Sequence, residues 1–382
     1  MDPIAHTLVG ASLARTPLGR LTALATPTLI LGANAPDLDA VTMFIDRDLS
    51  LGFRRGWTHG ALALAVLPLL LTGLICLLDR CSARIRGRPP RARPGPLLAL
   101  AYLGVASHPA LDWLNTYGVR FLMPFDGRWF YGDALFIGDP WVWLLVGAGA
   151  VAAQARSTAG TVGWLILGTA LTALIVVVGN APGPAILVWL AGGTVLAAVR
   201  ARGLSARQTS RLATACLAGA GVYMLAMVGA SRVAVLQVAD WLEARGAPFV
   251  DIMAGPLPAN PFVRDVVVAD ADHYHFLAVD WLRADPIRVG SPAVQRGRGD
   301  PIVAAALRAP QVQGIRTWLR FPVYTVEELS DGYRVTIRDA RYTRRRGPRF
   351  PDIAVELDHA LRPASIRRGC APNPRRPLAG TP

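Results

Sequence analysis

Long apolar runs fill most of the first 230 or so residues, and short charged segments separate them. A helix needs about 20 apolar residues to cross a hydrocarbon core that is roughly 30 Å thick. Thr58–Leu78 meets this length most clearly. The first run would reach only about 16 Å as a helix, so we expect it to be half-inserted or interfacial. The predicted helical segments are Ile4–Ala14, Leu18–Asn34, Thr58–Leu78, Pro96–Leu114, Pro140–Ala153, Thr161–Val178, Pro184–Val199 and Leu212–Gly229.

From about Ala230 the long apolar runs give way to period-two alternation. VVVADADHYHFLAVDWL and YRVTIRDARYT predict β-strands, and SDGY at Ser330–Tyr333 predicts a hairpin turn. The predicted fold is therefore a mainly α-helical polytopic membrane protein with a small β-rich extramembrane C-terminal domain. We expect a membrane domain at 1–229, the β-rich domain at 230–361 and a disordered Arg/Pro-rich tail at 362–382.

Composition agrees with a membrane protein. The chain is 52% hydrophobic and 17% charged, with a mean hydropathy of +0.35. Its net charge of +14 comes from arginine alone, and many of the arginines lie in short loops, which indicates membrane topology rather than nucleic-acid binding. The cysteines lack CxxC spacing and predict neither a disulfide framework nor a thiolate metal site: Cys76, Cys81, Cys216 and Cys370.

The arginine-rich loops also predict an orientation. The loop from Arg80 to Arg93 carries six arginines and is expected to be cytoplasmic, as is the loop from Arg200 to Arg211. The uncharged turn Asn180–Pro184 and the β-rich domain then fall outside the cell or in the periplasm. This orientation places three arginines outside, which is evidence against it: Arg47, Arg54 and Arg55.

Most ionisable residues near the apolar runs fall at the same, outer ends of the predicted helices. Such residues are costly at membrane depth and tend to be functional. The set is His6, Asp37, Asp39, His59, His108, Asp112, Asp133 and Asp139. His108 and Asp112 are four residues apart, which puts them on one helical face. Three histidines with several carboxylates predict a divalent-metal site that suits zinc, with manganese as the second choice.

Each residue also has a structural interpretation. A single interfacial histidine such as His6 is commonly a hydrogen-bonded cap. Asp37 and Asp39 would cap a turn after Pro36, Thr58 would cap the helix that begins beside His59, and Asp112 beside Trp113 would mark the water interface. Asp133 or Asp139 would cap the helix that begins at Pro140. His273, His275 and His359 are expected to be surface residues rather than metal ligands.

Several short motifs occur in a fixed order within Met1–Val151: His6-Thr7, NAPDLD, RGWTH, SHPALDWLNTYGVRFLMPF and FIGDPW. Together they resemble the inner-membrane, metal-dependent hydrolases of the LexA-regulated YdjM type. GPLPANPFVRDVVVADADHYHF further resembles the β-rich tail of some members. The resemblance implies a multi-pass inner-membrane hydrolase related to zinc-dependent phospholipases C. Its motif positions correspond here to His6, Asp37, Asp39, His59, His108 and Asp112.

One position departs from the family pattern. Members often show His-Arg-Gly-x-Thr-His, whereas this chain has Arg54 at the first position. Either the protein has lost a metal ligand there, or Arg54 holds a substrate phosphate, for which a guanidinium is geometrically suited.

The leading hypothesis is a hydrolase that acts at the outer membrane face on a phosphoester of a lipid or other membrane-associated substrate. His6, His59, His108 and Asp112 are the expected ligands, and Asp37 or Asp39 is a further ligand or the general base. Arg54 and Arg55 would neutralise an anionic head group. The expected partners are membrane lipids and a lipid or isoprenoid phosphate, with no nucleic acid. The alternative is a non-enzymatic transporter or scaffold with a structural metal site.

Overall fold

The computed structural model describes residues 1–153, 157–178, 181–297, 299–343 and 352–363. The chain forms two compact units, Met1–Val294 and Gln295–Pro382, and each is described by itself.

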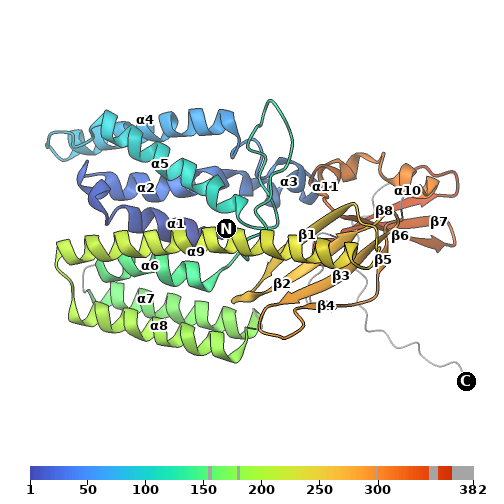
Figure 1. The fold of residues 1–382 in the computed structure, drawn as a ribbon. Coiled ribbons are helices and arrows are strands. Elements are labelled where there is room, and N and C mark those ends of the chain that lie inside the picture. Colours follow the sequence, from blue (N-terminus) through green and yellow to red (C-terminus); the bar gives the residue numbers. More distant parts are fainter. Residues whose placement is uncertain (154–156, 179–180, 298, 344–351, 364–382) are drawn as a thin grey trace, which may run out of the picture. The chain divides into compact units, whose positions relative to one another are not determined.

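Long helices running side by side make up most of the first unit (Figure 1). Short 3₁₀ helices η1 (Pro17–Arg20) and η2 (Ala35–Phe44) and a π-helical turn η3 (Leu174–Val178) lie among them. The α-helices are α1 (Pro3–Leu13), α2 (Ala25–Asn34), α3 (Arg47–Phe53), α4 (Ala61–Ile85), α5 (Pro94–Trp113), α6 (Pro140–Ala153), α7 (Thr158–Ala173), α8 (Gly183–Arg202) and α9 (Ala206–Glu243).

Each predicted apolar segment corresponds to a helix, with two differences. The segment predicted from Leu18 forms η1, and α2 begins only at Ala25. Pro27 explains the late start, because proline is tolerated in the first turn of a helix but breaks an interior. The segment predicted at Leu212–Gly229 is much longer, since α9 starts at a capping box between Ser205 and Gln208 and continues to Glu243.

Four helical segments of the described chain are long and apolar enough to cross a membrane: Ala61–Ile85, Thr158–Val177, Gly183–Arg202 and Ala206–Glu243. Their apolar side chains face outward to an extent that is unusual for helices in water. Leu70 of α4 is 62% exposed and Leu165 of α7 is 63% exposed. Outward leucines along such helices are expected where lipid is the solvent. Pro3–Leu13 and Pro140–Ala152 are apolar but shorter.

Helices α2 and α5 pack backbone against backbone. A Cβ atom on Gly104 would lie 3.1 Å from the Leu29 carbonyl oxygen and 3.2 Å from the Gly32 Cα. Small residues at both positions let the helices approach this closely. The close approach brings the end of α2 beside the turn of α5 that carries His108.

A sheet with four antiparallel strands completes the first unit. The four strands are β1 (Asp251–Leu257), β2 (Asn260–Ala269), β3 (His273–Asp280) and β4 (Ile287–Val289), in this order, which confirms the predicted strands around VVVADADHYHF. A short fifth strand, β5 (Val294–Gln295), pairs with β3 and brings the sheet to five strands in the described part of the chain. The sheet packs on the end of α9, where Ala234, Val238 and Leu242 recur every four residues and are buried. The limit predicted at Gly229 falls inside α9, and the division into 1–229, 230–361 and 362–382 stays a prediction.

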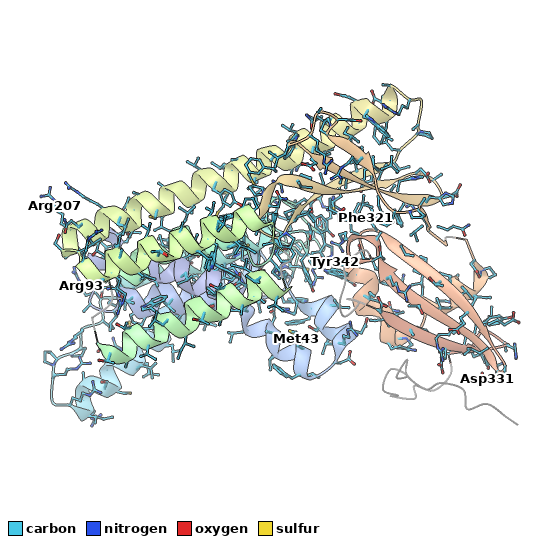
Figure 2. The ribbon with its side chains drawn as sticks, turned by 90° about the horizontal axis from the view of Figure 1, so that it is seen from below. Met43, Arg93, Arg207, Phe321, Asp331 and Tyr342 are labelled. Carbon is cyan, nitrogen blue, oxygen red and sulfur yellow. The ribbon has the colours of Figure 1, made fainter. Side chains whose placement is uncertain are left out.

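The second unit contains a three-stranded antiparallel sheet of β6 (Pro322–Leu329), β7 (Gly332–Asp339) and β8 (Ile353–Asp358). The predicted hairpin is confirmed, because Leu329 pairs with Gly332 across the turn, and Asp331 lies at its tip (Figure 2). The remaining elements are α10 (Pro301–Ala306), η4 (Pro310–Val312), α11 (Gln313–Trp318) and η5 (Ala340–Tyr342), and β5 (Val294–Gln295) lies at the boundary of the two units. Of the predicted tail, residues 364–382 lie outside the described residues.

The α2–α5 contact generates a test of the fold. Gly104→Leu is expected to cost about 1–3 kcal/mol of stability, because the side chain meets backbone atoms of α2. Thermal unfolding in detergent measures this loss. Gly73→Leu is the matched control, since a Cβ on Gly73 of α4 meets no atom within 4 Å. Equal unfolding temperatures for the two variants would contradict the close packing.

Candidate metal centre

Four segments of the first unit bring polar side chains to one place: α1, η2, the turn Arg54–Gly60 and the last turns of α5. The turn is folded by hydrogen bonds from His59 N and Gly60 N to the Gly56 carbonyl, at 3.0 and 2.8 Å. Arg55 has a φ of 53°, a left-handed conformation that a non-glycine residue adopts at a cost. The turn thereby directs His59 toward the end of α5.

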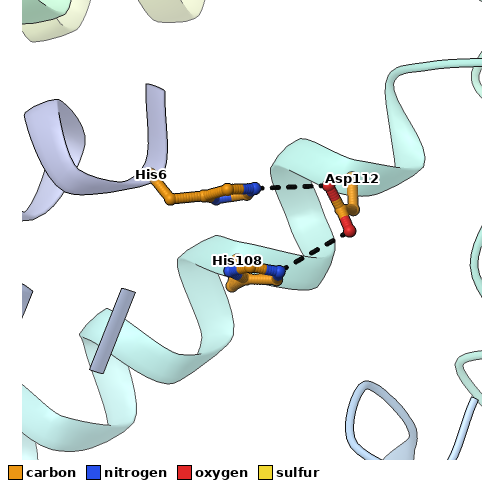
Figure 3. A group of neighbouring side chains, drawn as sticks. All are labelled: His6, His108 and Asp112. Atoms are coloured by element: carbon orange, nitrogen blue, oxygen red, sulfur yellow. Dashed lines mark hydrogen bonds and ion pairs between the residues drawn. The ribbon is translucent and has the colours of Figure 1, made fainter. Parts of the chain in front are cut away.

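Three histidines surround the carboxylate of Asp112. His6 Nε2 lies 3.3 Å from Asp112 Oδ1, while His59 Nε2 and His108 Nε2 lie 3.3 and 3.6 Å from Oδ2. The His6 and His108 rings stack with centroids 3.7 Å apart (Figure 3). All four residues have an exposed fraction of 0%. The structure thus brings together four of the predicted ligands from three separate segments.

Hydrogen bonds fix the tautomers of two of these histidines. His108 Nδ1 lies 2.6 Å from the Ala33 carbonyl oxygen, which can only accept, so this nitrogen carries hydrogen. Thr58 donates its hydroxyl hydrogen to Asp39 Oδ2 at 2.7 Å, and its oxygen then accepts from His59 Nδ1 at 2.9 Å. In the neutral rings, Nε2 of both histidines therefore carries a lone pair and no hydrogen. Metal-bound histidines characteristically donate their other ring N–H to such a carbonyl or polar partner.

The two Nε2 atoms lie close to the same oxygen of Asp112, at distances near those between two ligands of one metal ion. Neither has a hydrogen-bond partner among the residues that the structure describes, although both are buried. Two ligands of a tetrahedral zinc with bonds of about 2.0–2.1 Å lie roughly 3.3–3.4 Å apart, and these nitrogens lie 3.3 and 3.6 Å from Asp112 Oδ2. With both rings neutral, these three atoms would all be acceptors with no hydrogen among them, an arrangement that favours a cation in their midst.

Two groups of described residues place their ligand atoms within 4.8 Å of one another. One is His6, His108 and Asp112, and the other is Asp37, His59 and His108. Both use His108, whose Nδ1 is occupied by the Ala33 carbonyl. A single Nε2 lone pair binds one ion, so the two groups describe alternatives around one centre rather than a metal pair.

Asp37 and Asp39 project from η2 and share Arg54. The guanidinium lies 3.4 Å from Asp37 Oδ1 and 3.4 Å from Asp39 Oδ1. Asp37 Oδ1 is 3.7 Å from His108 Nε2, and its side chain is 18% exposed. Asp39 is buried and instead contacts the Nδ1 side of His59, at 3.4 Å. The two carboxylates thus differ in place: Asp37 faces the centre, and Asp39 lies behind His59.

Hydrogen bonds hold both carboxylates in their charged form. Burial would raise the pKa of Asp37, but the hydrogen bond and charge of His108 lower it below its ordinary value. Burial would likewise raise the pKa of Asp39, and the contacts with His59, Thr58 and the Arg55 backbone N–H lower it. Both carboxylates are therefore anionic at neutral pH.

A buried arginine holds the central carboxylate, and sequence reasoning missed this role. Arg55 places Nε 2.9 Å from Asp112 Oδ2 and donates from NH2 to Oδ1 at 3.1 Å. It also donates to Asn115 Oδ1 at 2.7 Å and lies over the Tyr117 ring. The amino group of Met1 contacts Asp112 Oδ1 as well. The sequence signal for this role is the pair of adjacent arginines, Arg54 and Arg55, close to His59. From the sequence alone, both arginines are assigned to an anionic head group instead.

The other predicted residues lie elsewhere or have structural roles. Asp139 caps α6, accepting from Trp141 N and Val142 N at 3.0 Å, as one interpretation predicted. Asp133 lies in the loop before it, with a φ of 51°. Thr58 does not cap α4, whose N-cap is Gly60, because its hydroxyl is committed to Asp39. His275 pairs with Asp270 at 2.6 Å beside the β2–β3 turn, and His359 contacts Tyr333 in the second unit.

Comparison with known families finds a match to the N-terminal part of the chain. The family model described as YdjM inner membrane protein matches residues 1–182, a range that contains every residue of the candidate centre. Comparisons with curated proteins and with solved structures find no match.

The Arg55–Asp112 contact generates a test of the centre. Arg55→Met is expected to cost about 3–5 kcal/mol in the presence of chelator, because it leaves a buried carboxylate without its main partner. Chemical or thermal unfolding measures the loss. Arg128→Met removes an exposed pair with Asp126 and is expected to cost less than about 1 kcal/mol. Similar losses in both variants would show that Asp112 does not depend on Arg55.

Proposed function

We propose that the protein is a membrane-bound metal-dependent hydrolase. Two observations support this: residues 1–182 match the model of the YdjM inner membrane protein family, and Nε2 of His59 and of His108 has no hydrogen-bond partner among the described residues. The observation that carries the proposal is the convergence of these two nitrogens on Asp112 Oδ2 at 3.3 and 3.6 Å. Its reaction is the hydrolysis of a phosphoester in a lipid or another membrane-associated substrate.

The proposed ligands are His59, His108 and Asp112, with His6 or Asp37 as the fourth. Nitrogen and oxygen ligands at these spacings suit zinc, and manganese is the second candidate. Asp39 and Arg55 orient the ligands, since they hold His59 and Asp112 respectively. Doubly protonated imidazoles would satisfy the same oxygens without an ion, so metal analysis distinguishes these two states.

The surrounding residues support hydrolysis. A divalent ion held at this centre would lower the pKa of a bound water from 15.7 to about 7 and polarise a phosphoryl oxygen. Asp37 is partly exposed, and its Oδ1 lies 3.7 Å from His108 Nε2, a position that suits a general base. Arg54 is 22% exposed and pairs with Asp37, so an anionic phosphate that enters beside Asp37 would meet its guanidinium.

Lipid substrates fit the setting of the centre best. A substrate dissolved in water would not require four helices that are long and apolar enough to span a membrane. We therefore propose a lipid or isoprenoid phosphate as the substrate, membrane lipids as partners and no nucleic-acid partner.

The second candidate is a transporter or scaffold in which the metal only ties helix ends together. Full burial of His6, His59, His108 and Asp112 favours this alternative, because closed sites are typical of structural metals. The two functions separate in one assay. Vesicles containing phospholipids and isoprenoid phosphates are incubated with the protein, and the hydrolase releases phosphate or head groups in a chelator-sensitive manner.

Metal content tests the ligand assignment. Purified protein is expected to hold about one zinc per chain, because His108 offers a single lone pair. His59→Ala/His108→Ala should lose it, with a drop of at least about 100-fold in affinity when two ligands are gone. His273→Ala/His275→Ala is the matched control and keeps the metal. Full metal content in the first double variant would refute the site.

Substitution of Arg54 tests its phosphate role. Arg54→Gln is expected to raise KM for a phosphoester about 10- to 100-fold, with a smaller effect on kcat, because it removes a charged hydrogen bond to the substrate. Arg128→Gln serves as the exposed control. Arg54→His restores the family pattern, and a gain of metal in that variant would favour a lost ligand instead. An unchanged KM in Arg54→Gln would exclude the phosphate role.

The proposed orientation is multi-pass, with the candidate centre on the periplasmic or extracellular side. Figure 2 shows Arg93 and Arg207 at one end of the helices and Met43, in the element that carries Asp37, at the other. By the positive-inside rule the arginine end is cytoplasmic. An epitope inserted between Ser330 and Asp331 should be accessible to a protease added from outside the inner membrane. Protection of the epitope from the protease in intact spheroplasts would show that the orientation is the opposite one.

A further inference from the structure

The 3₁₀ helix η2 has an unusual distribution of side chains. A 3₁₀ helix has three residues per turn, so every third residue lies in one row. The inner row, Pro36, Asp39 and Thr42, is buried. The outer row is Leu38, Val41 and Phe44, which are 66%, 60% and 89% exposed. The helix therefore turns its carboxylate inward and its large apolar side chains outward, the reverse of a helix that faces water.

The third row connects this apolar face to the candidate centre. It contains Asp37, which contacts Arg54 and His108, and Met43, whose sulfur lies 3.5 Å from Arg54 NH1. Rows of a 3₁₀ helix are about 120° apart. The apolar row and the row that faces Arg54 are thus adjacent faces of one short helix.

Neighbouring segments add apolar side chains near the start of α4. Leu62 of α4 is 47% exposed, and α4 is a candidate membrane span. Ala61 N donates to the Phe121 carbonyl at 2.8 Å, which holds the loop that carries Phe125 beside this helix end. Phe125 is 84% exposed, and Trp57, in the turn before α4, is 47% exposed. Aromatic side chains at a helix end are characteristic of the membrane interface.

We infer that the outer row of η2, Leu38, Val41 and Phe44, inserts into the outer leaflet of the bilayer, so that the partly exposed Asp37 and Arg54 beside the candidate centre face the lipid head groups. The bilayer is the occupant because α4 beside η2 is itself apolar and outward-facing over the length of a membrane span. An interfacial helix of this kind lies in the membrane plane with its apolar face buried in the head-group and acyl boundary.

The insertion defines the substrate class more narrowly, and this step rests on the proposed function. A phospholipid in the same leaflet would place its phosphate beside Arg54 and Asp37 while its acyl chains stay in the bilayer beside Leu38, Val41 and Phe44. Long-chain lipids embedded in a membrane are then the preferred substrates, and only their turnover, not that of short-chain esters dissolved in water, depends on the inserted row.

Spin-label accessibility tests the insertion without any measurement of activity. Native cysteines are replaced by serine, and single cysteines are introduced at Leu38, Val41, Thr42 and Phe44 in full-length protein, in vesicles of phosphatidylethanolamine and phosphatidylglycerol. Leu70→Cys is the lipid control and Asp331→Cys the water control. Spin labels at positions 38, 41 and 44 should be more accessible to oxygen than to a nickel chelate, like the label at position 70. The label at position 42 should be shielded from both reagents.

Two results would overturn the inference. Nickel accessibility at 38, 41 and 44 equal to that at 331 would place the row in water, and protection from both reagents would show that a protein partner or second copy covers it. The accessibility of the labels does not depend on bound metal or on activity. Failure of the proposed function can therefore be distinguished from failure of the insertion.

A second arm tests the substrate class. Leu38→Asp/Phe44→Asp should lower turnover of vesicle-embedded phospholipid roughly tenfold or more, because two apolar contacts with the membrane are lost. Its turnover of a soluble short-chain phosphoester should be unchanged. Equal loss on both substrates would contradict lateral access.

Discussion

The buried carboxylate of Asp112 is the charge around which the site is arranged. Removing such a group from water is expensive unless its oxygens are paired. Here Arg55 occupies one side, and His6, His59 and His108 occupy the other. The partners come from α1, the RRGWTH turn and α5, so the neutralisation of one charge links these three segments.

The same constraint explains the local backbone. Arg55 adopts a left-handed φ, which directs its guanidinium toward Asp112 and its N–H toward Asp39 Oδ2 at 2.9 Å. Asp39 in turn fixes Thr58, and Thr58 fixes the tautomer of His59. A chain of hydrogen bonds therefore leads from a strained turn to one nitrogen lone pair. The close contact of α2 with α5 has the parallel effect on His108, because it supplies the Ala33 carbonyl.

Sequence reasoning located the helices, and it named polar residues that the structure brings together, because apolar periodicity and charge placement are local signals. His108 and Asp112 could be paired from their spacing alone, and His6 and His59 from their shared end of the helices. It placed α2 too early at Leu18 and ended α9 too soon at Gly229, since Pro27 and the sheet contacts of Ala234 and Val238 decide those limits. The roles of Arg55 and Asn115 were not predictable, because they depend on contacts between residues about 60 positions apart.

The central claim is that His59 and His108 bind one metal ion with Asp112, and X-ray absorption at the zinc edge of the purified protein tests it most directly. The account predicts nitrogen and oxygen scatterers alone, at about 2.0–2.1 Å, with the outer-shell signal of at least two imidazoles. A sulfur scatterer near 2.3 Å, or the absence of an imidazole signal, would contradict it.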